Sequence, residues 1–460
     1  MGLINKIAQY KELKSGVKHC TFNPDGPGVV RIHLIPPKFN FFKSSSYVVI
    51  LNGYYLLPLG YSWAIMLSKF INEVNKFDGK PITDQDYKNI FDITVEKSYK
   101  VYPSINKEDM KDDLSFMLDT IFKVAKGQNI DTEIEKMSIR QYGKNMIAPH
   151  RMDLMISAMN DENGKWQCNQ KCIFCYASGQ CLSKTKELST QEWKKAIDKL
   201  KKAGVPMVTF TGGEPTLRQD LCELIDYSKW FVTRLNTNGV LLTPSLCEIL
   251  AKASLDSVQI TLYSSDENIH NALVGSERFC DTVNGIKNAV NSGLDVSINT
   301  PLCKKNSDYI STLKFVKDLG VKFVTVSGLI CTGTAEINHS EYDLSSNELY
   351  ETVKSAKEFC NANGMEIDFT SPGLIKKELL EELNMNVPMC GACLSNMAIA
   401  PDGTVIPCQS WLKEGSGLGN ILTENFNKIW NNKKCYGLRN MNDTEALNCP
   451  FRKENRGECE

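Results

Sequence analysis

The sequence predicts an α/β fold whose central part is a partial (β/α)6 barrel. The first observation behind this is a regular alternation of strand-like and helix-like segments between about residues 152 and 369. The second is a well-marked helix-to-strand unit, in which Ser189 and Glu192 form a capping-box pattern and Gly204 ends the helix before an apolar run. Both observations are typical of a sheet whose strands are joined by helices.

Six apolar segments in this region have the length and composition of buried strands. They alternate with helical segments, one of which opens at Thr243-Pro244, and therefore imply a parallel sheet with right-handed crossovers. In an incomplete barrel of this kind we expect the chemistry to gather at the carboxyl ends of the strands. The expected strands are Met152–Ile156, Val205–Phe210, Phe231–Thr237, Asp256–Leu262, Leu294–Thr300 and Val321–Ser327.

The first 130 residues have a different pattern and predict a separate small α/β domain. Its polar stretch Gly127–Glu133 is the expected linker to the barrel. The expected elements are two strands, Val29–Leu34 and Tyr47–Leu51, followed by three helices, Ser62–Asn75, Thr83–Lys97 and Asn106–Lys126.

Composition narrows the function class. The chain has 460 residues, of which 42% are hydrophobic, so it can form several domains. Its 53 basic and 54 acidic residues leave a net charge of −1, which favours neither a nucleic-acid partner nor an anionic membrane. Apolar stretches such as Tyr54–Leu59 are far shorter than a membrane span, and Met1–Tyr10 lacks a signal-peptide core. We therefore expect a cytoplasmic protein with no membrane partner.

Seventeen cysteines in a long chain without an export signal favour metal ligation over disulfides wherever they cluster. One cluster lies near residue 170 and a second lies in the last 75 residues. Isolated cysteines in periodic segments behave as small apolar residues, and we assign to packing Cys222, Cys247, Cys280, Cys303, Cys331 and Cys360.

The first cluster, Cys168, Cys172 and Cys175, follows a candidate strand and precedes Tyr176. Three thiolates within eight residues can hold three irons of a cubane and leave the fourth iron open to a cosubstrate. The alternative is a zinc knuckle, for which Cys181 is the local candidate for a fourth ligand.

This C-x3-C-x2-C pattern with a following aromatic residue resembles the signature of the radical S-adenosylmethionine (SAM) superfamily. The resemblance implies a partial TIM barrel, a SAM-binding [4Fe–4S] cluster, and reductive cleavage of SAM to a 5′-deoxyadenosyl radical that abstracts hydrogen from the substrate. In that family a Gly-Gly-Glu turn after the next strand holds the SAM amino group. By resemblance, the cofactor-binding residues are Tyr176, Gly212, Gly213, Glu214, Thr237, Asn238, Thr261 and Asn299. The last four are weaker matches, since polar residues at strand ends are usually satisfied turn residues.

The second cluster resembles the SPASM or shorter Twitch extension of radical SAM enzymes, which carries auxiliary iron–sulfur clusters. Its Cys393 and Cys408 stand in the pattern C-x9-G-x4-C. By resemblance, at least one auxiliary [4Fe–4S] cluster is held by Cys390, Cys393 and Cys408, with Cys449 or Cys459 as the fourth ligand. A zinc ribbon would use the same thiolates.

One departure from the two-cluster pattern favours a single auxiliary cluster, because Arg452 stands where a further cysteine is expected. Cys435 lies at a position that is usually apolar, so we assign it to packing. The expected domains are residues 1–130, 131–375 and 376–460.

SPASM and Twitch enzymes commonly modify ribosomally synthesised precursor peptides (RiPPs), and many carry a winged-helix-like domain that binds the leader by strand addition. Residues 1–130 resemble such a domain coarsely, although they could simply brace the barrel. The expected function is therefore a peptide maturase that forms a thioether or carbon–carbon crosslink, supplied with electrons by a flavodoxin- or ferredoxin-type reductant. The alternatives are a peptide epimerase, a dehydrogenase of a small molecule or protein side chain, and a non-catalytic iron–sulfur or zinc-binding protein.

The sequence identifies no catalytic acid or base. Four residues lie near predicted strand ends and could reach the cavity, although each is more often structural at such a position: Cys181, Cys331, Tyr263 and Glu341.

Overall fold

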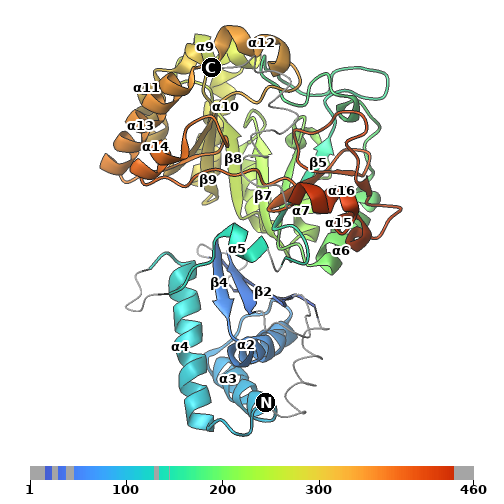
Figure 1. Ribbon diagram of the computed structural model, residues 1–460, viewed down its shortest axis with the longest axis vertical. Helices are drawn as coiled ribbons and strands as arrows, with labels where there is room; N and C mark the ends of the chain where they lie inside the picture. Colours follow the sequence, from blue (N-terminus) through green and yellow to red (C-terminus); the bar gives the residue numbers. More distant parts are fainter. Residues whose placement is uncertain (1–15, 23–28, 38–45, 129–133, 144–145, 440–460) are drawn as a thin grey trace. The chain divides into compact units, whose positions relative to one another are not determined.

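The computed structural model describes residues 16–22, 29–37, 46–128, 134–143 and 146–439, which form two compact units (Figure 1). The first unit contains residues 1–150 together with Leu200–Met207 and Trp230–Val232, and the second contains the rest of the chain. No helix among the described residues is long and apolar enough to cross a membrane.

The first unit is built on a four-stranded antiparallel sheet of order β1-β2-β3-β4. The predicted strands correspond to β2 and β3, whereas β1 and β4 were missed. Pro58 weakens the strand pattern of β4, and it is tolerated because β4 lies at an edge of the sheet. The strands are β1 (Lys18–Phe22), β2 (Val30–Ile35), β3 (Tyr47–Leu51) and β4 (Tyr55–Leu59).

Three long helices follow this sheet, as predicted. Thr83 and Asp86 form the capping box that starts the second helix, and Asn106 caps the third. The helices are α2 (Tyr61–Val74), α3 (Asp84–Tyr99) and α4 (Lys107–Ala125), with a short η1 (Asn75–Phe77) after the first and a short α5 (Ile139–Gly143) nearer the barrel in sequence.

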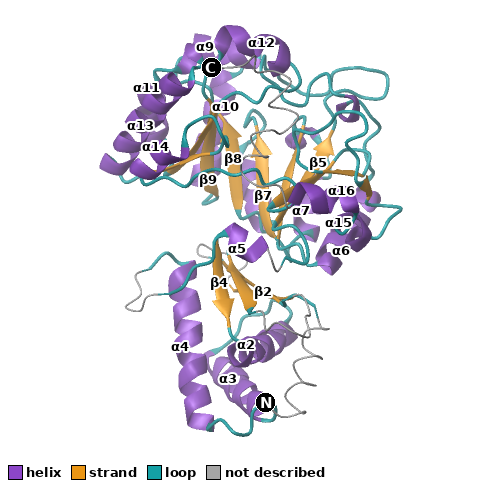
Figure 2. Cartoon of the chain, in the orientation of Figure 1, coloured by secondary structure: helices purple, strands orange, loops and turns teal. Residues whose placement is uncertain are grey.

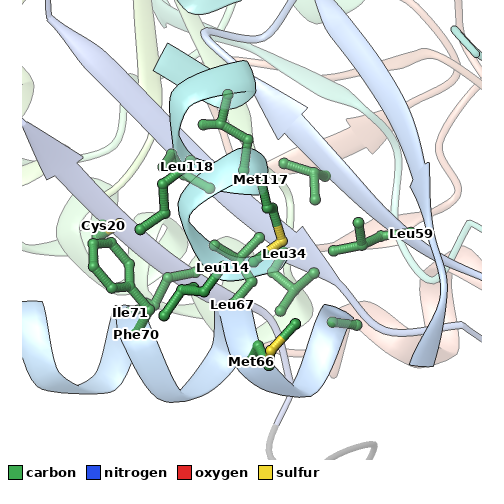
Figure 3. Close-up of a cluster of buried hydrophobic side chains, with 14 of the residues drawn as sticks. Cys20, Leu34, Leu59, Met66, Leu67, Phe70, Ile71, Leu114, Met117 and Leu118 are labelled. Atoms are coloured by element: carbon green, nitrogen blue, oxygen red, sulfur yellow. The ribbon is translucent and has the colours of Figure 1, made fainter. Parts of the chain in front are cut away.

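The core of the first unit forms where α2 and α4 meet the sheet. Figure 3 shows Phe70 and Ile71 of α2 facing Leu114 and Leu118 of α4. All four side chains are fully buried, and each contributes roughly 1.5–3 kcal/mol of transfer free energy. The apolar side chains on the facing sides of α2 and α4 therefore hold this unit together.

The second unit is organised around an open ten-stranded sheet of order β11-β10-β9-β8-β7-β6-β5-β12-β13-β14. All six predicted barrel strands are present, the second of them shifted to end at Gly212, and β11 extends the series. Neighbouring strands from β7 to β11 are parallel. The barrel strands are β5 (Arg151–Ser157), β6 (Met207–Gly212), β7 (Val232–Thr237), β8 (Ser257–Thr261), β9 (Asp295–Pro301), β10 (Phe323–Ser327) and β11 (Glu366–Phe369).

Helices connect these strands in alternation (Figure 2). Thr243 caps the helix that begins with Pro244, as the sequence predicts. The helices are α6 (Thr190–Ala203), α7 (Leu221–Tyr227), α8 (Pro244–Lys252), α9 (Glu267–Val274), α10 (Phe279–Asn291), α11 (Tyr309–Asp318), α12 (Ala335–Tyr342), α13 (Ser346–Ala362) and α14 (Lys377–Glu382), with 3-10 turns η2 (Cys181–Ser183), η3 (Pro215–Leu217) and η4 (Lys304–Asn306).

The two faces of this sheet differ in polarity, because side chains alternate along each strand. Val258 and Ile260 of β8 are fully buried on one face, whereas Gln259 and Thr261 lie on the other and are half-buried. The next two strands place polar residues beside Thr261 on the same face, since Thr261 pairs with Asn299 and Asn299 pairs with Thr325. Uncharged polar groups therefore line this face toward the carboxyl ends of β8, β9 and β10, whereas Arg234 and Asp295 lie on it toward the other end of the strands.

The cysteine-rich C-terminal segment joins the same sheet. Its first strand, β12 (Asn396–Ile399), pairs in parallel with β5 at the register Asn396 to Arg151. A turn with Gly403 in the left-handed region leads to the antiparallel β13 (Thr404–Ile406). The remaining elements are β14 (Gly419–Asn420), α15 (Phe426–Trp430) and α16 (Lys433–Arg439).

A glycine on α10 tests how tightly a helix packs against the β7–α8 connection. A Cβ at Gly285 would lie 2.0 Å from the Gly239 carbonyl oxygen, so Gly285→Ala should destabilise the protein by about 1–3 kcal/mol despite the better helix propensity of alanine. The matched control is Gly437→Ala in α16, where a Cβ would have no neighbour within 4 Å and the melting temperature should stay equal or rise. Differential scanning calorimetry under anaerobic conditions measures both, and equal melting temperatures for the two variants would contradict the expected packing.

Candidate functional site

The three clustered cysteines lie in the long, mostly irregular connection between β5 and α6. The end of α9 holds this loop, because the N–H groups of Lys171 and Ile173 donate to the carbonyls of Val274 and Leu273 at 2.9 and 3.0 Å. The last carbonyls of a helix have no hydrogen-bond donor within the helix, and here the loop provides those donors.

A second segment, the connection from β10 into α12, holds the other side of the loop. The Thr334 N–H donates to the Cys175 carbonyl at 3.0 Å, and Asn338 Nδ2 donates to the Ile173 carbonyl at 2.8 Å. Gly333 has a φ of +65°, and a Cβ there would lie 2.3 Å from the Cys175 oxygen. Only glycine allows this close approach, which the sequence analysis did not foresee.

Burial dominates the electrostatics of the three thiols. It raises the pKa of Cys168 to about 12 and raises the pKa values of Cys172 and Cys175 as well. The negative charge of the neighbouring sulfurs adds to the shift at Cys168 and Cys172, as does that of Glu214. Three half-buried thiols with raised pKa values lie together here, and a cationic metal centre would stabilise all three as thiolates.

The Gly-Gly-Glu turn packs directly against the start of this loop. Gly212 has a φ of +139°, and a Cβ there would lie 2.3 Å from the Ser157 carbonyl oxygen. The Gly213 N–H donates to that same oxygen at 2.9 Å. The glycines thus let the end of β6 meet the end of β5, where the cysteine loop begins.

Glu214 is fully buried, and four hydrogen bonds satisfy its carboxylate. Oε1 accepts from the Thr216 N–H and from the hydroxyls of Thr216 and Thr237, at 3.0, 2.6 and 2.7 Å, and Oε2 accepts from the Asn238 N–H at 2.8 Å. Burial raises the pKa of Glu214, and these donors oppose the rise. Asn238 Nδ2 in turn donates to Asn169 Oδ1 at 2.6 Å, so the network reaches the cysteine loop.

Two further predicted cofactor residues lie side by side at the ends of β8 and β9. Thr261 and Asn299 are register partners, and Asn299 Oδ1 accepts from the Thr325 hydroxyl at 2.9 Å. Sequence reasoning did not include Thr325, although its position two residues before the end of β10 repeats the same polar pattern.

Several buried polar atoms around the loop have no hydrogen-bond partner among the described residues. They are Asn169 Nδ2, Gln170 Nε2, Ser157 Oγ and Asn236 Oδ1. Buried polar groups are normally paired, so these atoms together with the three thiols fit a cluster and a polar cosubstrate.

Tyr176 lies between the first cysteine group and the C-terminal one. Its side chain is half-buried, desolvation of the hydroxyl raises its pKa, and the charges of Cys175 and Cys408 add to the shift. Its hydroxyl donates to Gln409 Oε1 at 3.5 Å. The two cysteine-rich segments therefore meet around one aromatic side chain.

Among the C-terminal cysteines, Cys393 is fully buried with a φ of +56°. Its thiol donates to Cys435, and this bond together with the positive charge of Arg439 lowers the pKa of Cys435. Arg439 also donates to the Cys393 carbonyl at 2.9 Å and stacks 3.2 Å over the ring of Trp430. The packing prediction for Cys435 was thus incomplete, since the residue is buried but also contacts an expected ligand.

The other predictions have mixed outcomes. Cys449 and Cys459 lie outside the described residues. Cys247, Cys303 and Cys360 are buried as predicted, but Cys280 is exposed because it lies on the outer face at the start of α10, so its assignment to packing was wrong.

Of the four cavity candidates, Tyr263 is buried and packs near Phe174 of the loop. Cys181 is exposed, and its thiol donates to the Leu412 carbonyl at 3.1 Å. Glu341 is exposed, and Cys331 lies close to His339 and Asp343.

Comparisons with known proteins agree with this geometry. The radical SAM superfamily profile matches residues 167–316, and the profile of the SPASM iron–sulfur cluster-binding domain matches residues 390–456. An AdoMet-dependent heme synthase of Methanosarcina barkeri is 28% identical over 295 residues, 61% of this chain and 83% of that protein. A probable GTP 3′,8-cyclase of Methanopyrus kandleri is 31% identical over 255 residues, 53% of this chain and 78% of that protein.

Among solved structures, Streptococcus suis SuiB bound to its precursor peptide SuiA matches with a TM-score of 0.58 and 17% identity, over 89% of this chain and 91% of SuiB. The profile matches include Cys168, Cys172 and Cys175 of the first group and Cys390, Cys393, Cys408 and Cys449 of the second, whereas Cys459 lies beyond the second match. They favour iron–sulfur clusters over the zinc knuckle and the zinc ribbon, and imply SAM as the cosubstrate of the first cluster. The chain belongs to the radical SAM superfamily and carries a C-terminal SPASM domain.

Proposed function

We propose that this radical SAM enzyme modifies a ribosomally synthesised precursor peptide, by forming a thioether or carbon–carbon crosslink. The observation that carries the proposal is the extent of the similarity to SuiB. It covers 89% of the chain, which is more than residues 134–460 alone could supply, so part of the N-terminal domain is included. SuiB was solved with a precursor peptide bound, and this supports a peptide substrate here.

The bound cluster and SAM would supply a 5′-deoxyadenosyl radical, which removes a hydrogen atom from the substrate. Cys168, Cys172 and Cys175 would hold three irons and leave the fourth iron open to SAM. Glu214 would accept one further hydrogen bond from the SAM ammonium group at Oε2, which accepts only from the Asn238 N–H, while Thr216 and Thr237 orient the carboxylate through Oε1.

The polar face of the sheet would bind the rest of the cosubstrate. Thr261 and Asn299 lie side by side there, and hydroxyl and amide groups of this kind suit a ribose and a carboxylate. Tyr176 would pack between this site and the SPASM domain.

In the SPASM domain, Cys390, Cys393 and Cys408 would hold an auxiliary cluster, with Cys449 or Cys459 as the fourth ligand. This centre would bind a substrate thiolate or take up the electron that remains after hydrogen abstraction. A flavodoxin- or ferredoxin-type protein would reduce the first cluster.

The N-terminal domain would bind the leader of the peptide as an added strand. Its sheet has two edges, β1 and β4. On β4, Pro58 lacks an N–H and the Leu56 carbonyl already accepts from the Met137 N–H at 2.8 Å. On β1 the His19 carbonyl also accepts a hydrogen bond, from Asn75 Nδ2 at 2.8 Å, but every residue of this strand has an N–H, so β1 is the better edge for a peptide strand.

A second candidate is the modification of a small molecule. The heme synthase and the GTP cyclase are named for small-molecule products or substrates, and they are more similar in sequence than SuiB is. Their matches cover only 61% and 53% of this chain, however, and the peptide proposal also gives the N-terminal domain a role.

The first test concerns the cluster ligands. Cys172→Ala should remove about four irons per chain from anaerobically reconstituted enzyme and abolish the release of 5′-deoxyadenosine in dithionite and SAM. The matched control is Cys280→Ala, since Cys280 is exposed on α10 and lies outside both cysteine clusters. Unchanged SAM cleavage in Cys172→Ala would refute the assignment.

The second test concerns Glu214. Glu214→Gln removes the negative charge and replaces an acceptor with a donor, so SAM affinity should fall roughly 10- to 100-fold while the iron content stays constant. Isothermal titration calorimetry measures the affinity. Glu192→Gln, at an exposed helix cap, is the control and should bind SAM like the wild type.

The third test concerns the peptide. A precursor peptide encoded beside this chain should lose the mass of two hydrogen atoms on co-expression with the wild type, and should stay unmodified with Cys408→Ala, even though that variant still cleaves SAM. Hydrogen–deuterium exchange of the full chain should slow in β1 when the peptide is added. An unmodified peptide that leaves the exchange of β1 unchanged would favour the small-molecule candidate.

A further inference from the structure

Three side chains beyond the cysteine clusters bring metal-binding atoms together. One donor atom each from Cys331, His339 and Asp343 lies within 4.8 Å of the other two. His339 and Asp343 are four residues apart, and the Asp343 N–H donates to the His339 carbonyl at 2.7 Å, so the two side chains share one face at the end of α12. Cys331 reaches them from the connection that precedes this helix.

His339 Nδ1 and Asp343 Oδ2 form a hydrogen bond of 2.8 Å, which a bound ion would replace. A tetrahedral zinc ion with bonds of about 2.0–2.3 Å would set its donor atoms about 3.3–3.6 Å apart. Side-chain rotation alone can supply the difference, because the group lies on a helix end and a loop.

The types of donor atom indicate which metal ion would bind. A thiolate, an imidazole and a carboxylate form a mixed set that matches Zn²⁺, whereas Mg²⁺ and Ca²⁺ prefer oxygen ligands alone. We propose that Cys331, His339 and Asp343 form a zinc site with three protein ligands, separate from the iron–sulfur clusters.

The surroundings leave a fourth position accessible. The side chains of His339 and Asp343 are 16% and 36% exposed, so water or a small ligand can reach the ion. Asp343 also lines a pocket with Leu302, Gly328 and Leu349. Zinc sites with three protein ligands and an open position bind water or substrate groups there.

The site has a direct connection to the cysteine loop. Between Cys331 and His339 lie Thr334 and Asn338, whose hydrogen bonds hold the carbonyls of Cys175 and Ile173. A zinc ion at this position would fix both ends of the segment that supports the radical-generating cluster.

The test measures zinc in the cluster-loaded full-length enzyme after incubation with one equivalent of Zn²⁺ and gel filtration. The wild type should retain about one zinc per chain, and Cys331→Ser and Asp343→Asn should each lose at least 80% of it, with iron unchanged. Cys280→Ser is the matched control and should retain zinc, since it removes an exposed thiol elsewhere. Elemental analysis counts both metals.

X-ray absorption at the zinc edge separates this site from misloading of the cysteine clusters. One sulfur neighbour, absent in Cys331→Ser, would support the proposal. Three or four sulfur neighbours would place the zinc in a cluster site and overturn it, as would equal zinc contents in the wild type and Cys331→Ser. Loss of the peptide-modifying activity alone bears on the proposed function and not on this site.

Discussion

The buried carboxylate of Glu214 is the interaction on which the arrangement of the site depends. An ionised group without water is costly unless its hydrogen-bonding capacity is filled. Here the donors come from the turn itself and from the end of β7, at Thr237 and Asn238. The carboxylate therefore joins two neighbouring strand ends. The hydrogen bond from Asn238 to Asn169 connects these strand ends to the cysteine loop.

A second constraint is the lack of space where backbone segments meet. Gly212 lies against Ser157, and Gly333 lies against Cys175, in both cases with a positive φ and no room for a Cβ. These contacts fix the loop from two sides by backbone hydrogen bonds and leave the three thiols oriented without a regular element of their own. Backbone contacts position such a loop more firmly than flexible side chains could, because few bonds rotate.

The sequence predicted the features that local chemistry encodes. Helix caps such as Ser189 with Glu192, the apolar strand runs and the cysteine spacing each have a physical signature within a few residues. It missed β1, which has a mixed polar composition, and β4, which contains Pro58. It also missed Asn169, Arg439 and the support from Thr334, because each acts through a partner far away in the chain and no local pattern marks such a contact.

The pairing of β12 with β5 has a consequence for biosynthesis. Asn396 and Arg151 are far apart in the sequence. The strands β12 and β5 can therefore pair only after the barrel strands between them have been made. During synthesis the amino-terminal parts of a protein fold first. The part of the SPASM domain that is anchored on β5 is thus completed after the barrel strands, so iron and sulfide can reach a folded pocket there only once β12 has been made.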